Sequence, residues 1–343
     1  MRVTITDIAT KLNISTSTVS RALKNNRRIS ESVRKLVNET AQEMGYRPNL
    51  LARSLVNEKT FTIGLVIHDI SWSFFSELSQ NIQNASESHG YSMFLYSSSD
   101  NAEKERIGIE SVISGRSDGL IVYANEDADN ICLLEQISKS GYPVVLLNNL
   151  ENAQLDIVTV DNFKGTSQVM EYLSGLGHNQ IAYIGPIPVK TVEKERLAGY
   201  EKFIKDKYGF VDRKMVFTGK PYPMLGYDIT REMIKNKMSP TAIVVYNDTM
   251  ALGVLRAILE FGRKIPDDFS VVGFDGLEIG LTAYPPLTTV AVPIIQMADT
   301  AVDLIVQRIE ALRSGKKPEF PSPQKIQLEP QIVVRNSTGK ATH

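Results

Sequence analysis

The chain has 343 residues, enough for two or three domains that each bury a core of their own. Its formal net charge is only −1, yet the first 60 residues hold 11 Lys and Arg against 5 Asp and Glu, and the remainder holds 27 against 34. A basic N-terminal region on an acidic body places a phosphate-binding surface at the N-terminus, although a solvated basic face gives the same count.

Cysteine content and hydropathy exclude several classes of protein. The single cysteine, Cys132, permits neither a disulfide framework nor a cysteine-based metal site within one chain, and it favours a reducing compartment. The chain begins with polar and charged residues, and no apolar run approaches the roughly 18 residues that span a bilayer. We therefore expect a cytoplasmic protein with no membrane partner.

The stretch from Ile5 to Leu23 predicts two short helices with a tight turn between them. The first helix ends near Leu12 and the second begins after Ile14, where Asn13 tolerates the left-handed backbone that a sharp turn needs. This spacing is a helix-turn-helix pattern. It depends on apolar or small residues at Ile5, Ile8, Ala9, Leu12, Ile14, Val19 and Leu23.

Polar residues at the starts of the two predicted helices are candidates for capping them. Thr6 is followed three positions later by an alanine and so forms no full capping box, while Asp7 favours the positive end of the first helix. Ser15 or Thr16 caps the second helix.

The exposed face of the second helix has the chemistry of a DNA reader. The Arg21 guanidinium matches the two acceptors of guanine in the major groove, and hydroxyl groups serve bases or phosphates. The alternative is a helical pair whose Ser and Thr residues only cap and solvate it. The reading residues on this face are Thr16, Ser17, Ser20 and Arg21.

A third helix and a short apolar segment follow. Residues 30–44 predict a helix capped by Ser30, which closes the small core before Gly45, Tyr46 and Pro48 break the path. Residues 49–57 form an apolar segment that is too short for a helix stable alone in water. It orders only when something holds it, or else it is a plain linker.

From Phe61 onward, apolar runs alternate with helical stretches. Such alternation predicts strands buried on both faces of a parallel, doubly wound sheet. The unit repeats over 61–161 and 162–290, which suggests two similar lobes. The fold class is therefore α/β, with an N-terminal all-α helix-turn-helix headpiece plus a two-lobed doubly wound α/β core.

Polar residues at the carboxyl ends of these strands are candidates for a ligand site. Asp161, Asn247 and Asp275 follow strands directly, and Arg196 follows a strand-end loop and begins a helix. A charged fork, an amide and carboxylates that face each other across a cleft hold ring hydroxyls. Helix capping is the alternative role for Asn247 and Asp275.

Motifs of catalysis are missing from the sequence. It contains no G-x-S-x-G, no P-loop and no G-x-G-x-x-G after a strand. Its four histidines have no metal-ligand spacing: His68, His89, His178 and His343. We expect neither an enzyme nor a metal site, and no cofactor other than a small-molecule effector.

The chain resembles the LacI/GalR family of bacterial transcription regulators over nearly its whole length. The resemblance begins with VTITDIATKLNISTSTVSRALKNNRRIS and continues in family order and spacing. Its further motifs are MGYRPNLLARSL at 44–55, TIGLVIHDIS at 62–71, RLAGY at 196–200, NDTMALG at 247–253 and VVGFDG at 271–276.

The resemblance implies a domain plan like that of periplasmic binding proteins behind a DNA-binding head. Residues 1–48 are the headpiece, 49–60 the hinge helix and linker, and 61–343 the effector-binding and dimerisation core. The chain crosses between lobes three times. Lobe 1 spans about 61–161 and 291–320, and lobe 2 about 162–290 and 321–338.

The resemblance also implies contacts with operator DNA. In the family the hinge helix forms on the operator and inserts a leucine from each subunit into the minor groove, the position of Leu55 here. The DNA-binding residues so implied are Thr4, Thr6, Ser15, Thr16, Ser17, Thr18, Ser20, Arg21, Asn25, Tyr46, Asn49, Ala52, Arg53 and Leu55.

The implied effector site departs from the family pattern in one stretch. Where relatives carry S-N-P-F-F, this chain has Ser71 to Phe75, so Trp72 stacks on a sugar or else lies on its own lobe. Lys190 suggests an anionic effector, or it is a surface lysine. The implied effector-binding residues are Trp72, Phe74, Asp161, Lys190, Arg196, Asn247 and Asp275.

The expected function is an operator-binding homodimeric repressor of a carbohydrate-utilisation operon, controlled by a sugar-like effector in the cleft. Alternatives are a purine- or nucleoside-responsive repressor and a catabolite regulator that answers to a phosphorylated carrier protein. Asp299 and Asp303, after PLTTV, stand against the carrier protein. A periplasmic sugar receptor would lack the basic head. The chain has no leucine heptad tail, which favours a dimer over a tetramer.

Overall fold

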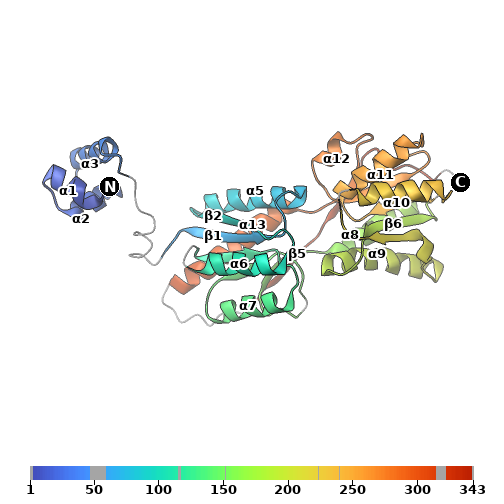
Figure 1. Ribbon diagram of the computed structural model, residues 1–343, viewed down its shortest axis with the longest axis horizontal. Helices are drawn as coiled ribbons and strands as arrows, with labels where there is room; N and C mark the ends of the chain where they lie inside the picture. The colour runs from blue at the N-terminus through green and yellow to red at the C-terminus, as the bar shows by residue number, and fades with distance from the viewer. Residues whose placement is uncertain are drawn as a thin grey trace. The chain divides into compact units, whose positions relative to one another are not determined.

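The computed structural model describes residues 3–46, 59–114, 117–150, 152–222, 224–238, 240–313 and 322–341. Backbone contacts divide the chain into two compact units, Met1–Thr60 and Phe61–His343. The first unit is the small helical head and the second holds both α/β sheets (Figure 1). Each unit has a core of its own.

The first unit consists of three helices around a small apolar core. They are α1 (Ile5–Leu12), α2 (Thr16–Leu23) and α3 (Glu31–Glu43). Asn13 ends α1 with φ of 52°, the left-handed conformation expected of the turn. The fully buried members of the core, Ile8, Val19, Ala22 and Val37, come from all three helices.

The start of α1 differs from the prediction. The N-cap is Thr4, and its backbone N–H donates to Asp7 Oδ2 at 2.8 Å while its hydroxyl accepts from the Asp7 N–H at 3.4 Å. A full capping box is therefore present, two residues before the threonine at which it was sought.

The first lobe of the core is an all-parallel sheet with helices on both faces. Its strand order is β11-β5-β4-β3-β1-β2. The helices α5 (Ser73–Ser88) and α13 (Ile294–Arg313) contact each other, and α6 (Ala102–Ile113) contacts α7 (Ala128–Lys139). Figure 1 shows these two pairs on opposite faces of the sheet. The strands are β1 (Thr62–Ile67), β2 (Ser92–Ser97), β3 (Gly119–Val122), β4 (Val144–Leu146), β5 (Asp156–Val160) and β11 (Lys325–Leu328).

The second lobe repeats this arrangement with the order β12-β10-β9-β8-β6-β7. The helices α8 (Asn162–Gly175) and α9 (Thr191–Tyr208) form one pair, and α10 (Leu225–Lys235) and α11 (Asp248–Glu260) form the other. The short helices η1 (Arg213–Met215) and α12 (Ile279–Thr282) complete it. The strands are β6 (Ile181–Pro186), β7 (Val216–Gly219), β8 (Ala242–Val245), β9 (Ser270–Asp275), β10 (Thr288–Ala291) and the antiparallel β12 (Gln331–Val333).

One boundary between the lobes was wrong. The segment 321–338 was assigned to lobe 2, but β11 pairs in parallel with β5 of lobe 1, and only β12 joins the second sheet. A buried ion pair accounts for the position of β11. Asp156 at the start of β5 binds Arg308 of α13 through two 2.7 Å contacts and accepts from the Gln324 N–H at 2.8 Å.

The described helices include none that is long and apolar enough to cross a lipid bilayer. The longest, α13, is amphipathic and packs against the first sheet.

Candidate functional site

The exposed face of α2 presents the side chains predicted to read DNA. Thr16, Ser17 and Arg21 are exposed, and Ser20 is half-buried. Arg21 makes no ion pair with any described residue, so its five donors are available for a ligand. The guanidinium and the Thr16 hydroxyl lie on a helix whose opposite face, Val19 and Ala22, is fully buried. The helix is therefore held rigidly while its polar face is exposed.

Several other residues predicted to contact DNA have structural roles in the head. Ser15 caps α2 by accepting from the Thr18 N–H at 3.1 Å, and its hydroxyl lies 2.8 Å from those of Ser17 and Thr18. Thr4 belongs to the capping box of α1. Thr6 and Asn25 are exposed, and Tyr46 packs against the core of the head. The hinge predictions Asn49, Ala52, Arg53 and Leu55 lie outside the described residues.

Arg196 is the centre of the predicted effector site. The sequence predicted that Arg196 begins a helix. Helix α9 begins earlier, at Thr191, so Arg196 lies in its second turn. The side chain is 6% exposed, and its guanidinium lies 3.7 Å from the centre of the Phe274 ring. It donates from Nε to Asn162 Oδ1 at 3.0 Å and from Nη1 to the Tyr246 carbonyl at 2.6 Å.

Asp275 completes this arrangement at the end of β9. Its Oδ1 lies 3.0 Å from Arg196 Nη2, and the residue is 5% exposed. Burial raises the pKa of the Asp275 carboxyl to about 6, although the Arg196 cation opposes the rise. The backbone of Asp275 has a φ of 108°, which a residue with a Cβ rarely adopts. Such strain is common at ligand sites.

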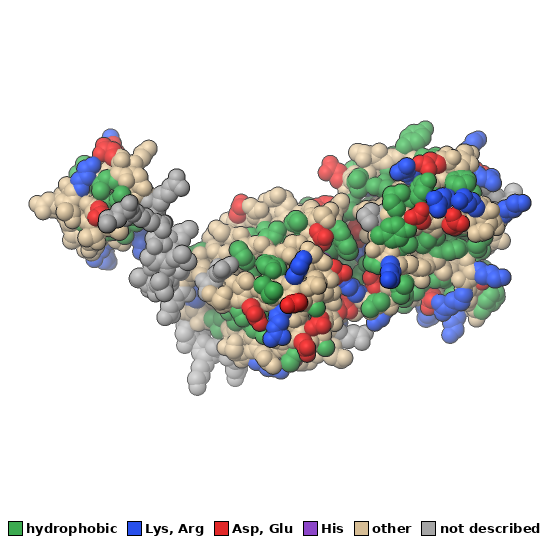
Figure 2. Space-filling model, in the orientation of Figure 1, with side chains coloured by type: hydrophobic (Ala, Val, Ile, Leu, Met, Phe, Trp, Pro, Cys, Tyr) green, Lys and Arg blue, Asp and Glu red, His purple; other side chains and the backbone are tan. Residues whose placement is uncertain are grey.

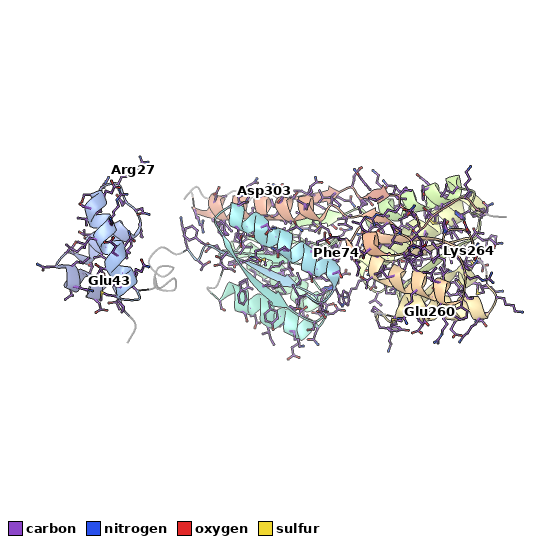
Figure 3. All side chains as sticks on the ribbon, turned by 90° about the horizontal axis from the view of Figure 1, so that it is seen from above. Arg27, Glu43, Phe74, Glu260, Lys264 and Asp303 are labelled. Carbon is purple, nitrogen blue, oxygen red and sulfur yellow. The ribbon has the colours of Figure 1, made fainter. Side chains whose placement is uncertain are left out.

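A small cavity lies against the Arg196 guanidinium between the lobes. Its volume is about 20 Å³, about that of one water molecule. Phe74 and Tyr123 of lobe 1 line one side, and Asn162 and Arg196 of lobe 2 line the other. Figure 3 shows Phe74 at the junction of the two lobes.

Two aromatic rings, those of Phe74 and Tyr123, contribute to the lobe 1 wall of this cavity together with aliphatic side chains. The Phe74 ring lies edge-on to Phe75 at 5.3 Å, and Phe75 lies edge-on to Tyr123 at 4.9 Å. His68 packs on both Phe75 and Tyr123. Burial and the Lys190 cation together lower the pKa of His68 to about 4, so the ring is neutral at pH 7.

Three predicted effector residues lie at the edge of this site. Trp72 is 46% exposed, with its ring 6.0 Å from that of Phe75. Asn247 caps α11 by accepting from the Met250 N–H at 2.9 Å, and Asp161 caps α8 by accepting from the Lys164 N–H at 2.8 Å. None of the three lines the small cavity. Their contact with an effector stays a prediction.

Lys190 has a role that neither interpretation of the sequence anticipated. It is half-buried and forms an ion pair with Asp100, which follows β2 in the opposite lobe. The lysine is therefore a contact between lobes.

Comparison with known proteins decides the class of this molecule. Residues 4–49 match the family described as "Bacterial regulatory proteins, lacI family", and residues 170–338 match the "Periplasmic binding protein-like domain". The HTH-type transcriptional regulator DegA of Bacillus subtilis (strain 168) is 31% identical, over 99% of each chain. The chain belongs to the LacI family of bacterial regulatory proteins.

Further relatives of this regulator carry different names. Catabolite control protein A of Priestia megaterium is 30% identical over 98% of this chain and 100% of that protein. The HTH-type transcriptional repressor PurR of Pasteurella multocida (strain Pm70) is 31% identical over 97% of this chain and 98% of its own.

Solved structures agree with the family over the whole chain. The lac repressor dimer bound to operator and the anti-inducer ONPF superposes with a TM-score of 0.86 at 27% identity, covering 99% of this chain and 100% of that one. The transcriptional regulator CelR in complex with cellobiose gives a TM-score of 0.70 at 26% identity, over 98% and 100%. This protein is thus a DNA-binding transcriptional regulator with an effector-binding domain, and its class is not enzymatic.

The structure of the regulator adds residues that the sequence interpretation missed. Asn162 is 4% exposed, lines the cavity and holds both Arg196 and, at 3.1 Å, Glu195 Oε2. It directly follows the strand-end Asp161, so the strand-end rule that found its neighbour also points to it. Tyr123 and Tyr246 also directly follow strands, so the same rule points to them.

Proposed function

We propose that this regulator binds a pseudo-palindromic operator as a homodimer in the cytoplasm and represses a carbohydrate-utilisation operon under the control of a sugar-like effector between the lobes. One observation carries the effector part of the proposal. The buried Arg196–Asp275 pair, 3.0 Å apart, is held by Asn162 and by a backbone carbonyl at the interface of the two lobes. Buried charges of this kind are expensive to maintain and are common at ligand sites.

The chemistry of this site favours a polyhydroxylated ring. A guanidinium donates only and a carboxylate accepts only, so the pair suits a hydroxyl that does both. The edges of Phe74 and Tyr123 give an apolar wall for the C–H face of a sugar. The CelR relative in complex with cellobiose supports this class of ligand.

A planar heterocycle is the second candidate for the effector. The same aromatic wall accepts a nucleobase, and the PurR relatives give this alternative weight. Control by a phosphorylated carrier protein is less favoured despite the catabolite control relative. Asp299 and Asp303 of α13 are both exposed and acidic, and they would repel a phosphate.

Exposed apolar side chains support a dimer. Ile279 and Leu281 of α12 are 45% and 54% exposed, and Tyr284 just after the helix is 83% exposed. Figure 2 shows hydrophobic side chains gathered over the helices of the second lobe. Apolar groups grouped in this way are typical of surfaces that bind another protein, and a two-fold operator needs two copies of the headpiece.

The test is a binding screen on the whole protein. Calorimetric titration against neutral sugars, sugar acids, sugar phosphates and nucleobases identifies the effector class, and Asp275→Ala should abolish the binding found. Arg256→Ala, an exposed arginine of α11, is the control for Arg196→Ala. The affinity of each variant for operator DNA should match that of the wild type without effector. Binding that survives both Asp275→Ala and Arg196→Ala would contradict the proposed site.

A further inference from the structure

Among the described residues, three pairs that involve side chains join lobe 1 to lobe 2 away from the crossover segments, and all three end on or just before helix α9. Asn149 Nδ2 donates to Glu195 Oε1 at 2.6 Å, and Asp100 forms an ion pair with Lys190. The third contact is made by Glu126, which follows β3. Both of its carboxylate oxygens accept from the Thr191 N–H at 3.0 Å, and Oε2 accepts from the Thr191 hydroxyl at 2.8 Å.

The Glu126 contact caps a helix from the opposite lobe. Helix α9 is 18 residues long, and its N-cap residue, Lys190, offers no side-chain oxygen. The Glu193 carboxylate turns back to the N–H groups of Val189 and Lys190, 2.8 Å from each. The free N–H of Thr191 is bound by Glu126 instead. A carboxylate at the positive end of a long helix is favourable, so the closed arrangement of the lobes gains from it.

The loop that carries Glu126 is fixed by buried groups. Ala124 is held by Asn148, which accepts from its N–H at 2.9 Å, and His68 Nε2 lies 3.1 Å from its carbonyl. The Asn125 N–H donates at 2.7 Å to Glu105, a fully buried carboxylate. Glu126 itself has a φ of 64°. Three buried side chains therefore fix the loop, and the loop fixes the position of Glu126. A freely mobile surface side chain would not be held in this way.

The two lobes approach closely beside Arg196. The cavity there holds about one water molecule. The contacts of α9 with lobe 1 stabilise this arrangement.

We propose that the contact of Glu126 with Thr191, here called the Glu126 latch, stabilises the closed arrangement of the two lobes. The latch is independent of which molecule the cleft binds. An effector larger than the cavity enters only when this contact opens, so the latch sets how often the cleft is accessible.

The single cysteine allows a direct test. Cys132 of α7 is exposed and lines an open groove of about 710 Å³ between the lobes, together with Glu126, Glu135 and Thr191. An environment-sensitive fluorophore attached to Cys132 of the full-length protein reports whether lobe 2 lies against it. The measurement is the emission maximum and the quenching constant for acrylamide, a neutral quencher.

Glu126→Ala is expected to shift the emission to the red and to raise the quenching constant about twofold, because the lobes open. Glu135→Ala is the matched control. It removes a carboxylate from the same groove, but that carboxylate accepts from Gln154 N–H at 3.0 Å within its own lobe. Its labelled protein should behave like the wild type.

A reciprocal variant tests the latch from the opposite lobe. Thr191→Pro removes both donors at the first position of α9, where proline is well tolerated. It should reproduce the effect of Glu126→Ala, and the double variant should add nothing further. Equal emission and quenching in wild type, Glu126→Ala and Thr191→Pro would overturn the proposal, as would an equal change in Glu135→Ala. If Glu126→Ala does not fold, Thr191→Pro against Glu135→Ala decides.

Discussion

Arg21 is the residue on which specific recognition of DNA should depend most. Its exposed guanidinium has no ion-pair partner among the described residues, and it lies on a helix whose other face is buried. This geometry suits bidentate contact with a guanine, which contributes about 1–3 kcal/mol of discrimination. If Arg21 contacted only a phosphate, it would contribute equally to the affinity for every DNA sequence.

Arg21→Ala should therefore weaken binding to the operator by about 10- to 100-fold and binding to random DNA far less. Fluorescence anisotropy at fixed salt, with operator and scrambled duplexes, measures both. Lys24→Ala, an exposed cation one residue beyond the same helix, is the control for charge alone. An equal loss on both duplexes would show that Arg21 contacts only the phosphate backbone.

Asp248 gives the core a dependence on pH. Burial and the nearby Asp275 carboxylate together raise its pKa to about 7, although the Thr289 hydroxyl, which donates to it at 2.6 Å, lowers it. The raised value means that the folded state binds the proton more tightly than the unfolded state. Stability is therefore greatest at low pH for this group, and it is lost as the pH rises from about 4 to about 7.

Asp248→Asn should flatten this dependence between pH 5 and pH 8. In the wild type, ionisation of the Asp248 carboxyl lowers the free energy of unfolding by at most about 4 kcal/mol over its whole titration. Urea unfolding of the core at both pH values measures the free energy of unfolding. Asp299→Asn, a change at an exposed residue, should leave the wild-type difference in the free energy of unfolding unchanged. If Asp248→Asn shows the same difference in the free energy of unfolding between the two pH values as the wild type, Asp248 is not its cause.

At the scale of elements, the first helix of the head depends on a local signal. Thr4 and Asp7 cap α1 reciprocally, whereas the Thr6 side chain has no part in the box. Because the head is small and its core comes from short helices, the loss of one cap is a large fraction of its stability.

Thr4→Ala should lower the free energy of unfolding of the head by about 1 kcal/mol. Thr6→Ala, two residues away on the same exposed surface, should change it by less than about 0.5 kcal/mol. Thermal unfolding followed by circular dichroism on residues 1–60 measures both. The reverse order would place the cap at Thr6 and contradict this assignment.

Features that depend on neighbouring residues could be predicted from the sequence. Features that depend on residues far apart in the chain could not. The turn at Asn13 and the strand-end positions of Asp275 and Asn247 follow from periodicity and from the geometry of parallel sheets. Strand β11 is only four residues long, and it pairs with β5 of the first sheet. Its place depends on Asp156 and Arg308, which are 152 residues apart.

The contacts between the lobes were beyond prediction for the same reason. Lys190, Asp100, Glu126 and Thr191 are ordinary polar residues in sequence, and only the approach of the two lobes brings them together. The strand-end rule proposes which residues line a cleft, but not which of them meet when it closes.

At the scale of the whole molecule, two separate cores predict two separable functions. The apolar core of the head contains no residue of the second unit, and residues 61–343 hold both sheets and the Arg196 site. A fragment that keeps a complete core should keep its stability, because hydrophobic burial is local to that core.

The fragment 61–343 should therefore fold, melt within about 2 °C of the core transition of the full chain, and bind the effector with unchanged affinity while losing all operator binding. Differential scanning calorimetry and the titration used for the effector screen measure these properties. The matched control is the full chain with Arg21→Ala, which keeps the head but should bind the operator about 10- to 100-fold more weakly. A core fragment that melts many degrees lower would show that the head stabilises it, and weaker effector binding by the fragment would show that the two units are coupled even without DNA.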